Sequence, residues 1–135
     1  MGAWSHESFG NDDAADWIAQ LEEQNDLGLV KSTLDAVLAI GDDYLEAPEA
    51  SEAIAAAEVV ARLQGRPGNG DADTEAVDEW VARVKLPAPP ALIAKARRAL
   101  DRILTEPSEL MELRDESEDA AAWRASVEDL KARLA

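Results

Sequence analysis

The sequence predicts an all-α protein, a single irregular or orthogonal bundle of about six or seven helices. Apolar residues recur at helical spacing along most of the chain, and no segment has the alternating pattern of a strand. The connections between these periodic segments are short, and no internal repeat is present. Because 135 residues is close to the commonest domain size, we expect residues 1–135 to form one domain.

Two amphipathic helices are expected first. Asn11 or Asp12 can cap the first helix, which runs to about Gln24. Its apolar face is formed by Ala14, Trp17, Ile18 and Leu21. The second helix is expected over about residues 25–41, and its wide apolar arc predicts contacts with two neighbouring helices.

The third helix is expected to be buried. Pro48 suits its first position, and Gly65 suits the position just after its last residue, Gln64. Residues 53–61 are apolar nearly all round, which is typical of a helix with neighbours on every side. Residues 65–72 then predict a flexible loop, which lacks the Gly-Lys-Ser/Thr pattern of a phosphate-binding loop.

Four more helical segments follow: about residues 73–84, one after the prolines at 87–90, a short one capped by Ser108, and one from about Ser117. The apolar periodicity places six large side chains in one common core: Trp17, Leu34, Val60, Trp80, Leu100 and Trp123. The fifth helix also carries a basic face that is either solvated or paired with acidic residues of this chain or of a second copy. The face is formed by Lys95, Arg97, Arg98 and Arg102.

The charge of the chain is strongly acidic and unevenly distributed. The formal net charge is −16, and residues 1–61 contain 14 acids but one base, Lys31. Such a field repels phosphate, so nucleic acid and anionic membranes are not expected as partners, whereas a basic protein is. The candidate protein-binding acidic surface consists of Asp12, Asp13, Asp16, Asp42 and Asp43.

The spacing of Asp12 and Asp16 permits a second interpretation. Residues four apart share a helix face, and paired carboxylates can hold Mg²⁺ or Ca²⁺. Acids in a first helical turn are also favoured by the helix dipole alone, and we therefore predict no metal site and no cofactor.

A set of possible buried acids surrounds the start of the third helix: Tyr44, Glu46, Glu52 and Glu58. Glu52 lies inside the apolar arc of that helix, and Glu58 can reach Arg62 one turn later. A carboxylate drawn into a core must be paired or hydrogen-bonded, or its pKa rises. We predict that at least one of Glu52 and Glu58 is buried and paired structurally, to an Arg, a Trp indole or Tyr44, rather than catalytic.

Two N-terminal residues have open roles. His6 is the only histidine in a chain without cysteine, so a zinc site or a Ser-His-Asp triad has little support. Trp4 either plugs the bundle or stands exposed as a binding anchor, and we favour the plug. A cysteine-free chain suits a reducing compartment, and we expect a cytoplasmic protein.

Several segments resemble one family. They are Met1-Gly2-Ala3-Trp4 with Phe9 and residues 11–17, then residues 44–61, then Ser108-Glu109-Leu110 and Trp123. Together they are similar to domain-of-unknown-function family 4259, with Ser5 standing where Gly is expected. The resemblance implies a bacterial helical domain with no assigned activity, and it transfers no catalytic residue.

No catalytic constellation emerges from these patterns. We therefore expect a non-catalytic protein-binding module, of the small acidic inhibitor or immunity-protein kind. The alternatives are a divalent-cation-dependent hydrolase using Asp12, Asp16 and glutamates of the third helix, and a structural subunit that associates with itself as a homo-oligomer.

Overall fold

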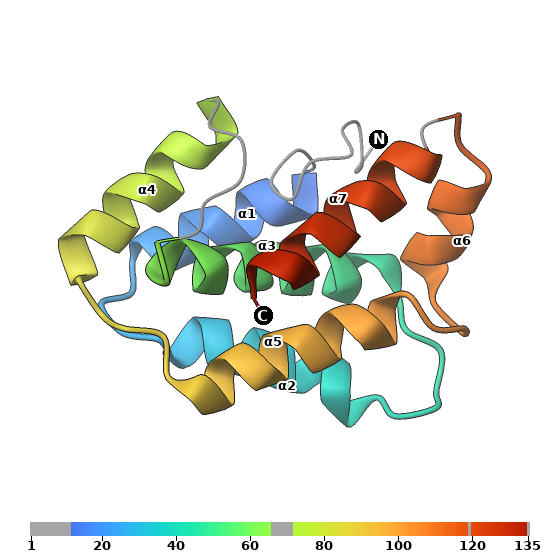
Figure 1. Ribbon diagram of the computed structural model, residues 1–135, viewed down its shortest axis with the longest axis horizontal. Helices are drawn as coiled ribbons and strands as arrows, with labels where there is room; N and C mark the ends of the chain where they lie inside the picture. Colours follow the sequence, from blue (N-terminus) through green and yellow to red (C-terminus); the bar gives the residue numbers. More distant parts are fainter. Residues whose placement is uncertain (1–11, 66–71, 119, 135) are drawn as a thin grey trace.

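Helix α3, Ala47–Leu63, is the centre of the molecule. The computed structural model describes residues 12–65, 72–118 and 120–134, and in these ranges α3 contacts every other helix. Figure 1 shows α4 and α6 near its two ends and α7 crossing it. The remaining helices are α1 Asp12–Glu22, α2 Gly28–Ala39, α4 Ala72–Val84, α5 Pro90–Ile103, α6 Glu109–Asp115 and α7 Ala120–Arg133. The predicted all-α bundle is thus confirmed, since the described residues form seven helices and no strand.

The sequence of α3 explains its central position. From residue 50 to residue 62 only Glu52 is not buried, and most of the other side chains are Ala, Ser or Val. Small side chains let six neighbours approach one helix, and an all-round apolar helix has no face suited to water. The buried third helix predicted from the sequence is therefore confirmed.

The ends of α3 lie within one residue of the predicted positions. Glu46 is extended, Pro48 lies in the first turn, and Gly65 follows the helix with a φ of +78°. A positive φ strains any residue with a Cβ, so glycine suits this stop. Residues 66–71 of the predicted flexible loop lie outside the described residues.

The boundary between α1 and α2 differs from the prediction. Instead of ending near Gln24, α1 ends at Glu22, and the indole of Trp80 on α4 donates a hydrogen bond of 2.9 Å to the Gln24 carbonyl. Instead of starting at residue 25, α2 starts at Gly28, whose N–H donates to the Asp26 carboxylate at 2.9 Å. Tertiary contacts and a local Asp turn thus use the backbone groups that a longer helix would need.

The start of α7 also differs. The sequence predicted Ser117, but α7 starts at Ala120. Ser117 donates from both its N–H and its hydroxyl to the carbonyl of Arg114, at 3.0 and 2.8 Å. It therefore closes the end of α6 instead of opening α7.

Arg102 has a structural role that the predicted basic face did not anticipate. Its guanidinium donates to the carbonyls of Gly41, Asp43, Thr105 and Pro107, at 2.6–3.0 Å. Beside it, Leu45 and Ser108 form an isolated parallel bridge. This arginine thus joins the loop after α2 to the loop after α5.

One hydrophobic core runs through the described helices. All six side chains predicted for it are at most 3% exposed, which confirms the prediction: Trp17, Leu34, Val60, Trp80, Leu100 and Trp123. The indole of Trp17 also donates to the Thr33 hydroxyl at 2.8 Å. Among the described residues, no helix has the length and apolar character needed to cross a membrane.

Candidate functional site

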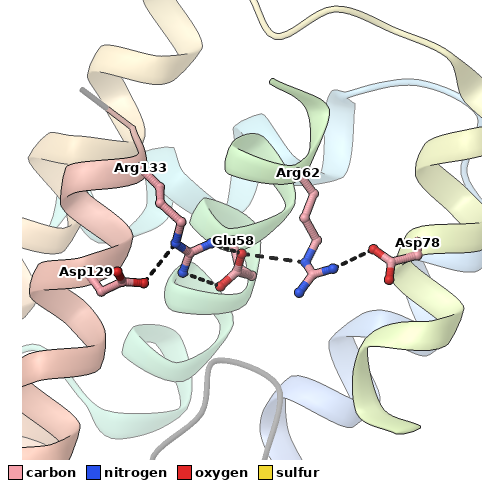
Figure 2. A network of polar contacts seen from close by, with 5 residues as sticks. All are labelled: Glu58, Arg62, Asp78, Asp129 and Arg133. Atoms are coloured by element: carbon pink, nitrogen blue, oxygen red, sulfur yellow. Dashed lines mark hydrogen bonds and ion pairs between the residues drawn. The ribbon is translucent and has the colours of Figure 1, made fainter. Parts of the chain in front are cut away.

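The most deeply buried carboxylate among the described residues belongs to Glu58, near the middle of α3. Its side chain is 4% exposed. Arg133 on α7 donates to both of its oxygens, with Nη1–Oε2 at 2.5 Å and Nη2–Oε1 at 2.8 Å (Figure 2). Arg62, one turn further along α3, places Nε 3.5 Å from Oε2.

The two arginines extend this pair into a network. Arg62 donates to Asp78 on α4 at 2.5 Å, and Arg133 donates to Asp129 on its own helix at 2.9 Å. Figure 2 shows the resulting row of alternating charges, which crosses from α7 over α3 to α4. Its outer members, Asp78 and Asp129, are more than half exposed, whereas Glu58 at its centre is buried.

This arrangement holds Glu58 as a structural anion. Two guanidinium groups compensate the cost of burying one carboxylate. The hydrogen bond to Glu58 raises the pKa of Arg133, so this arginine keeps its charge. The prediction that Glu52 or Glu58 is buried and paired is confirmed for Glu58.

The other three members of the predicted acid set do not join Glu58. Tyr44 is 49% exposed and Glu46 is exposed, because both precede the first turn of α3 at the surface. Glu52 is only half-buried and lies toward α1. The expected cluster of four is therefore wrong: α3 separates its exposed first turn from its buried middle.

The surface around the start of α3 instead gathers acids from three helices. We call this group the acidic end: Asp13, Asp16, Glu46, Glu49, Glu52, Glu109 and Glu112. Partial burial raises the pKa of Glu52, and the negative charges of its neighbours on α1 and α3 raise it further. Partial burial also raises the pKa of Tyr44, and the negative charges of Glu112 and Glu109 raise it further. Glu46, the residue before α3, lies near Tyr44, and Glu49, in the first turn of α3, lies near Glu52, so the two parts meet at the start of α3.

The structure brings two of the five acids predicted for the protein-binding surface into the acidic end. Asp13 and Asp16 lie beside the glutamates of α3, but Asp42 and Asp43 lie in the loop between α2 and α3. Figure 1 shows that loop at the lower right, well away from the start of α1. Of Asp12 only the backbone is described. Asp43 nevertheless directly precedes Tyr44, whose neighbours Glu109 and Glu112 belong to the acidic end, so the single surface of five acids stays a prediction.

Within the described part of the chain, no group of three or more His, Cys, Asp or Glu side chains is placed to hold a metal ion. The predictions for Trp4 and His6 fall outside the described residues. Sequence reasoning also missed the roles of Arg133 and Arg102. Helical spacing gave the contact of Glu58 with Arg62, but only the crossing of α7 over α3 brings Arg133 to it.

One comparison with known proteins gives a result. Residues 2–126 match a family model described as "Domain of unknown function (DUF4259)". No curated protein and no solved structure matches the chain. The matched segment contains Glu58, Arg62 and Asp78, and it ends before Asp129 and Arg133.

Proposed function

Because the chain belongs to the DUF4259 family, it inherits no described activity, and we propose a function from its geometry: a non-catalytic module that binds a basic protein surface through its acidic end. The kind we propose is a small acidic inhibitor or immunity protein in the bacterial cytoplasm. A chain without cysteine suits that reducing compartment.

The observation that carries the proposal is the lack of ion pairs at the acidic end, where one carboxylate, that of Glu109, instead accepts the N–H of Ala47 at the start of α3 at 2.7 Å. None of its seven carboxylates forms an ion pair with a basic side chain in the described ranges. Like charges that raise the pKa of a neighbour destabilise the free protein. A basic partner would relieve that repulsion on binding.

Seven basic side chains of the described residues are engaged away from the acidic end. Five of them form ion pairs with described acids: Arg62, Lys95, Arg124, Lys131 and Arg133. Arg83 and Arg102 donate to backbone carbonyls. The excess negative charge is therefore presented outward, where it can steer a basic protein and speed association.

Tyr44 adds an aromatic anchor to this surface. It is one of two large hydrophobic side chains exposed in the described ranges, and it lies beside Glu112 and Glu109. Tyrosines are enriched among the residues that contribute most to protein interfaces. An aromatic ring bordered by carboxylates fits a partner surface rich in Lys and Arg.

The test compares two triple variants in affinity capture from the source bacterium, with captured proteins identified and then purified. The acidic-end variant is Asp16→Asn, Glu49→Gln and Glu52→Gln. The matched control removes three exposed acids away from the acidic end, one just after α1 and two on α4, as Glu23→Gln, Glu75→Gln and Glu79→Gln.

We expect wild type and control to bind the same purified basic protein, with an association rate that falls steeply as salt rises. The acidic-end variant should bind it at least about tenfold more weakly, the loss of roughly 1.4 kcal/mol. Equal weakening in both variants, or no specific partner for the wild type, would overturn the proposal.

A further inference from the structure

A separate hollow lies where α2 and α5 begin, at the lower left of Figure 1. Its volume is about 360 Å³, at the lower end of the range for small-molecule pockets. Apolar side chains line most of its wall, and two lysines border it: Leu27, Pro89, Ala91, Leu92, Lys31 and Lys95. Leu92 also belongs to the hydrophobic core, so the floor of the hollow is an extension of that core.

The two lysines differ in their engagement. Lys95 places Nζ 2.5 Å from the carboxylate of Asp35. Lys31 is exposed and makes no ion pair within the described ranges. Lys85, Arg97 and Arg98 are likewise exposed without an ion pair in these ranges, so what distinguishes Lys31 is its position at the edge of an apolar hollow.

Lys31 is the ammonium group at the hollow that remains available to an anion, since the nearby carboxylates are engaged elsewhere. The carboxylate of Asp26 accepts the N–H of Gly28, and that of Asp35 is engaged by Lys95. The start of α5 is a positive helix end, but Pro89 and Pro90 have no N–H to donate there, so the ammonium group of Lys31 is the group that would hold an anion. An inorganic anion would leave the apolar wall exposed to water, and an apolar molecule without charge would leave Lys31 unused.

We propose that this hollow binds a linear monocarboxylate of medium chain length, with its alkyl chain against Leu27, Pro89 and Leu92 and its carboxylate at Lys31. The alkyl chain supplies most of the affinity, since burial of apolar surface is the dominant favourable contribution. The carboxylate is oriented by Lys31 and secondarily by Lys95. This site is independent of the acidic end, which lies at the start of α3.

The test measures binding by calorimetry and by amide chemical shifts, with hexanoate, octanoate and decanoate as probes below their micelle concentrations. Octanamide is the uncharged probe and octylamine the cationic one. Each added methylene should tighten the dissociation constant about fourfold until the hollow is filled. Octanamide and octylamine should bind at least about fivefold more weakly than octanoate.

Three variants locate the site. Lys31→Gln should weaken octanoate about threefold to tenfold and leave octanamide unchanged. Ala91→Trp places a large side chain at an exposed wall position and should abolish binding of every probe. Lys85→Gln, an exposed lysine outside the hollow, is the matched control and should bind like wild type.

Circular dichroism and a thermal melt establish that each variant is folded. The proposal would be overturned if octanoate showed no saturable binding, or if octanamide bound as tightly as octanoate. It would also be overturned if Lys31→Gln and Lys85→Gln changed octanoate binding equally. So would chemical shifts confined to residues away from α2 and α5. The acidic-end variant should bind octanoate as the wild type does, so this result stands or falls separately from protein binding.

Discussion

The guanidinium of Arg133 and the carboxylate of Glu58 meet through two hydrogen bonds, although 75 positions separate them in the sequence. Arg133 lies near the end of the last helix, and Glu58 lies on the central one. This contact attaches α7 to the helix on which the whole bundle is assembled. The two partners should differ in how much their loss lowers the free energy of unfolding, and this difference is the first prediction.

Removal of Arg133 should destabilise the protein more than neutralisation of Glu58. Arg133→Met leaves a buried carboxylate with one of its two guanidinium partners, and we expect a loss of about 2–3 kcal/mol. Glu58→Gln removes the buried charge, while Arg62 keeps Asp78 and Arg133 keeps Asp129, so we expect about 1 kcal/mol. Urea denaturation of both variants and the double variant measures the difference. A larger cost for Glu58→Gln would show that the carboxylate is not the group at risk.

The raised pKa of Glu52 predicts a pH dependence of stability. The folded protein binds the Glu52 proton more tightly than the unfolded chain, whose Glu52 titrates near its ordinary 4.5. Stability contributed by the protonated form is therefore present at low pH and lost as pH rises from 4.5 through the higher pKa of the folded state. Glu52→Gln should flatten this part of the profile and raise the melting temperature at pH 7 by roughly 1–4 °C. Melting curves across pH, with Glu75→Gln as control, provide the measurement; identical profiles for the two variants would contradict it.

Truncation of a core tryptophan should threaten folding. Trp17→Ala and Trp123→Ala each remove a side chain that is at most 3% exposed, and we expect losses of about 3–5 kcal/mol. Trp17→Phe should cost less, because it keeps most of the packing and loses the hydrogen bond to Thr33. Urea melts decide, and a loss below about 1 kcal/mol for either alanine variant would mean that its helix is oriented differently.

Arg102 should control the order of the two loops that it joins. Arg102→Met leaves the carbonyls of Gly41 and Asp43 without their guanidinium donor, and we expect about 1–3 kcal/mol of destabilisation. Arg98→Met removes an exposed arginine of the same helix and should cost at most about 0.5 kcal/mol. Amide hydrogen exchange at Leu45 and Glu109, whose N–H groups bond across the two loops, should accelerate in the Arg102 variant alone. Equal acceleration in both variants would remove the special role of Arg102.

Local signals predicted the helices well and their neighbours poorly. Pro48 and Gly65 marked the ends of α3 because the backbone requirements of these residues act within one turn. The contact between Glu58 and Arg62 follows from helical spacing alone. The start of α2 was misplaced because Asp26 forms a turn with Gly28, and the end of α1 because side chains of α4 bind its carbonyls.

The candidate site depended on information that periodicity does not contain. Helical spacing correctly placed Asp13 and Asp16 on the solvent side of α1. It could not predict which residues of other helices lie beside them, because that depends on how all seven described helices pack. For that reason periodicity did not reveal that Glu49 and Glu52 are the neighbours of Asp13 and Asp16. The hollow between α2 and α5 was invisible for the same reason, since its two lysines are 64 positions apart.

The central position of α3 has a consequence during synthesis on the ribosome. Its last residue, Leu63, is made about 70 residues before Arg133, and α4 to α7 all cover surface that α3 otherwise exposes. At 5–20 residues per second, a helix whose middle is mostly apolar waits roughly 4–14 s for its remaining neighbours. During that interval the nascent chain is an attractive client for chaperones that bind apolar segments, and its many carboxylates help to keep it from aggregating.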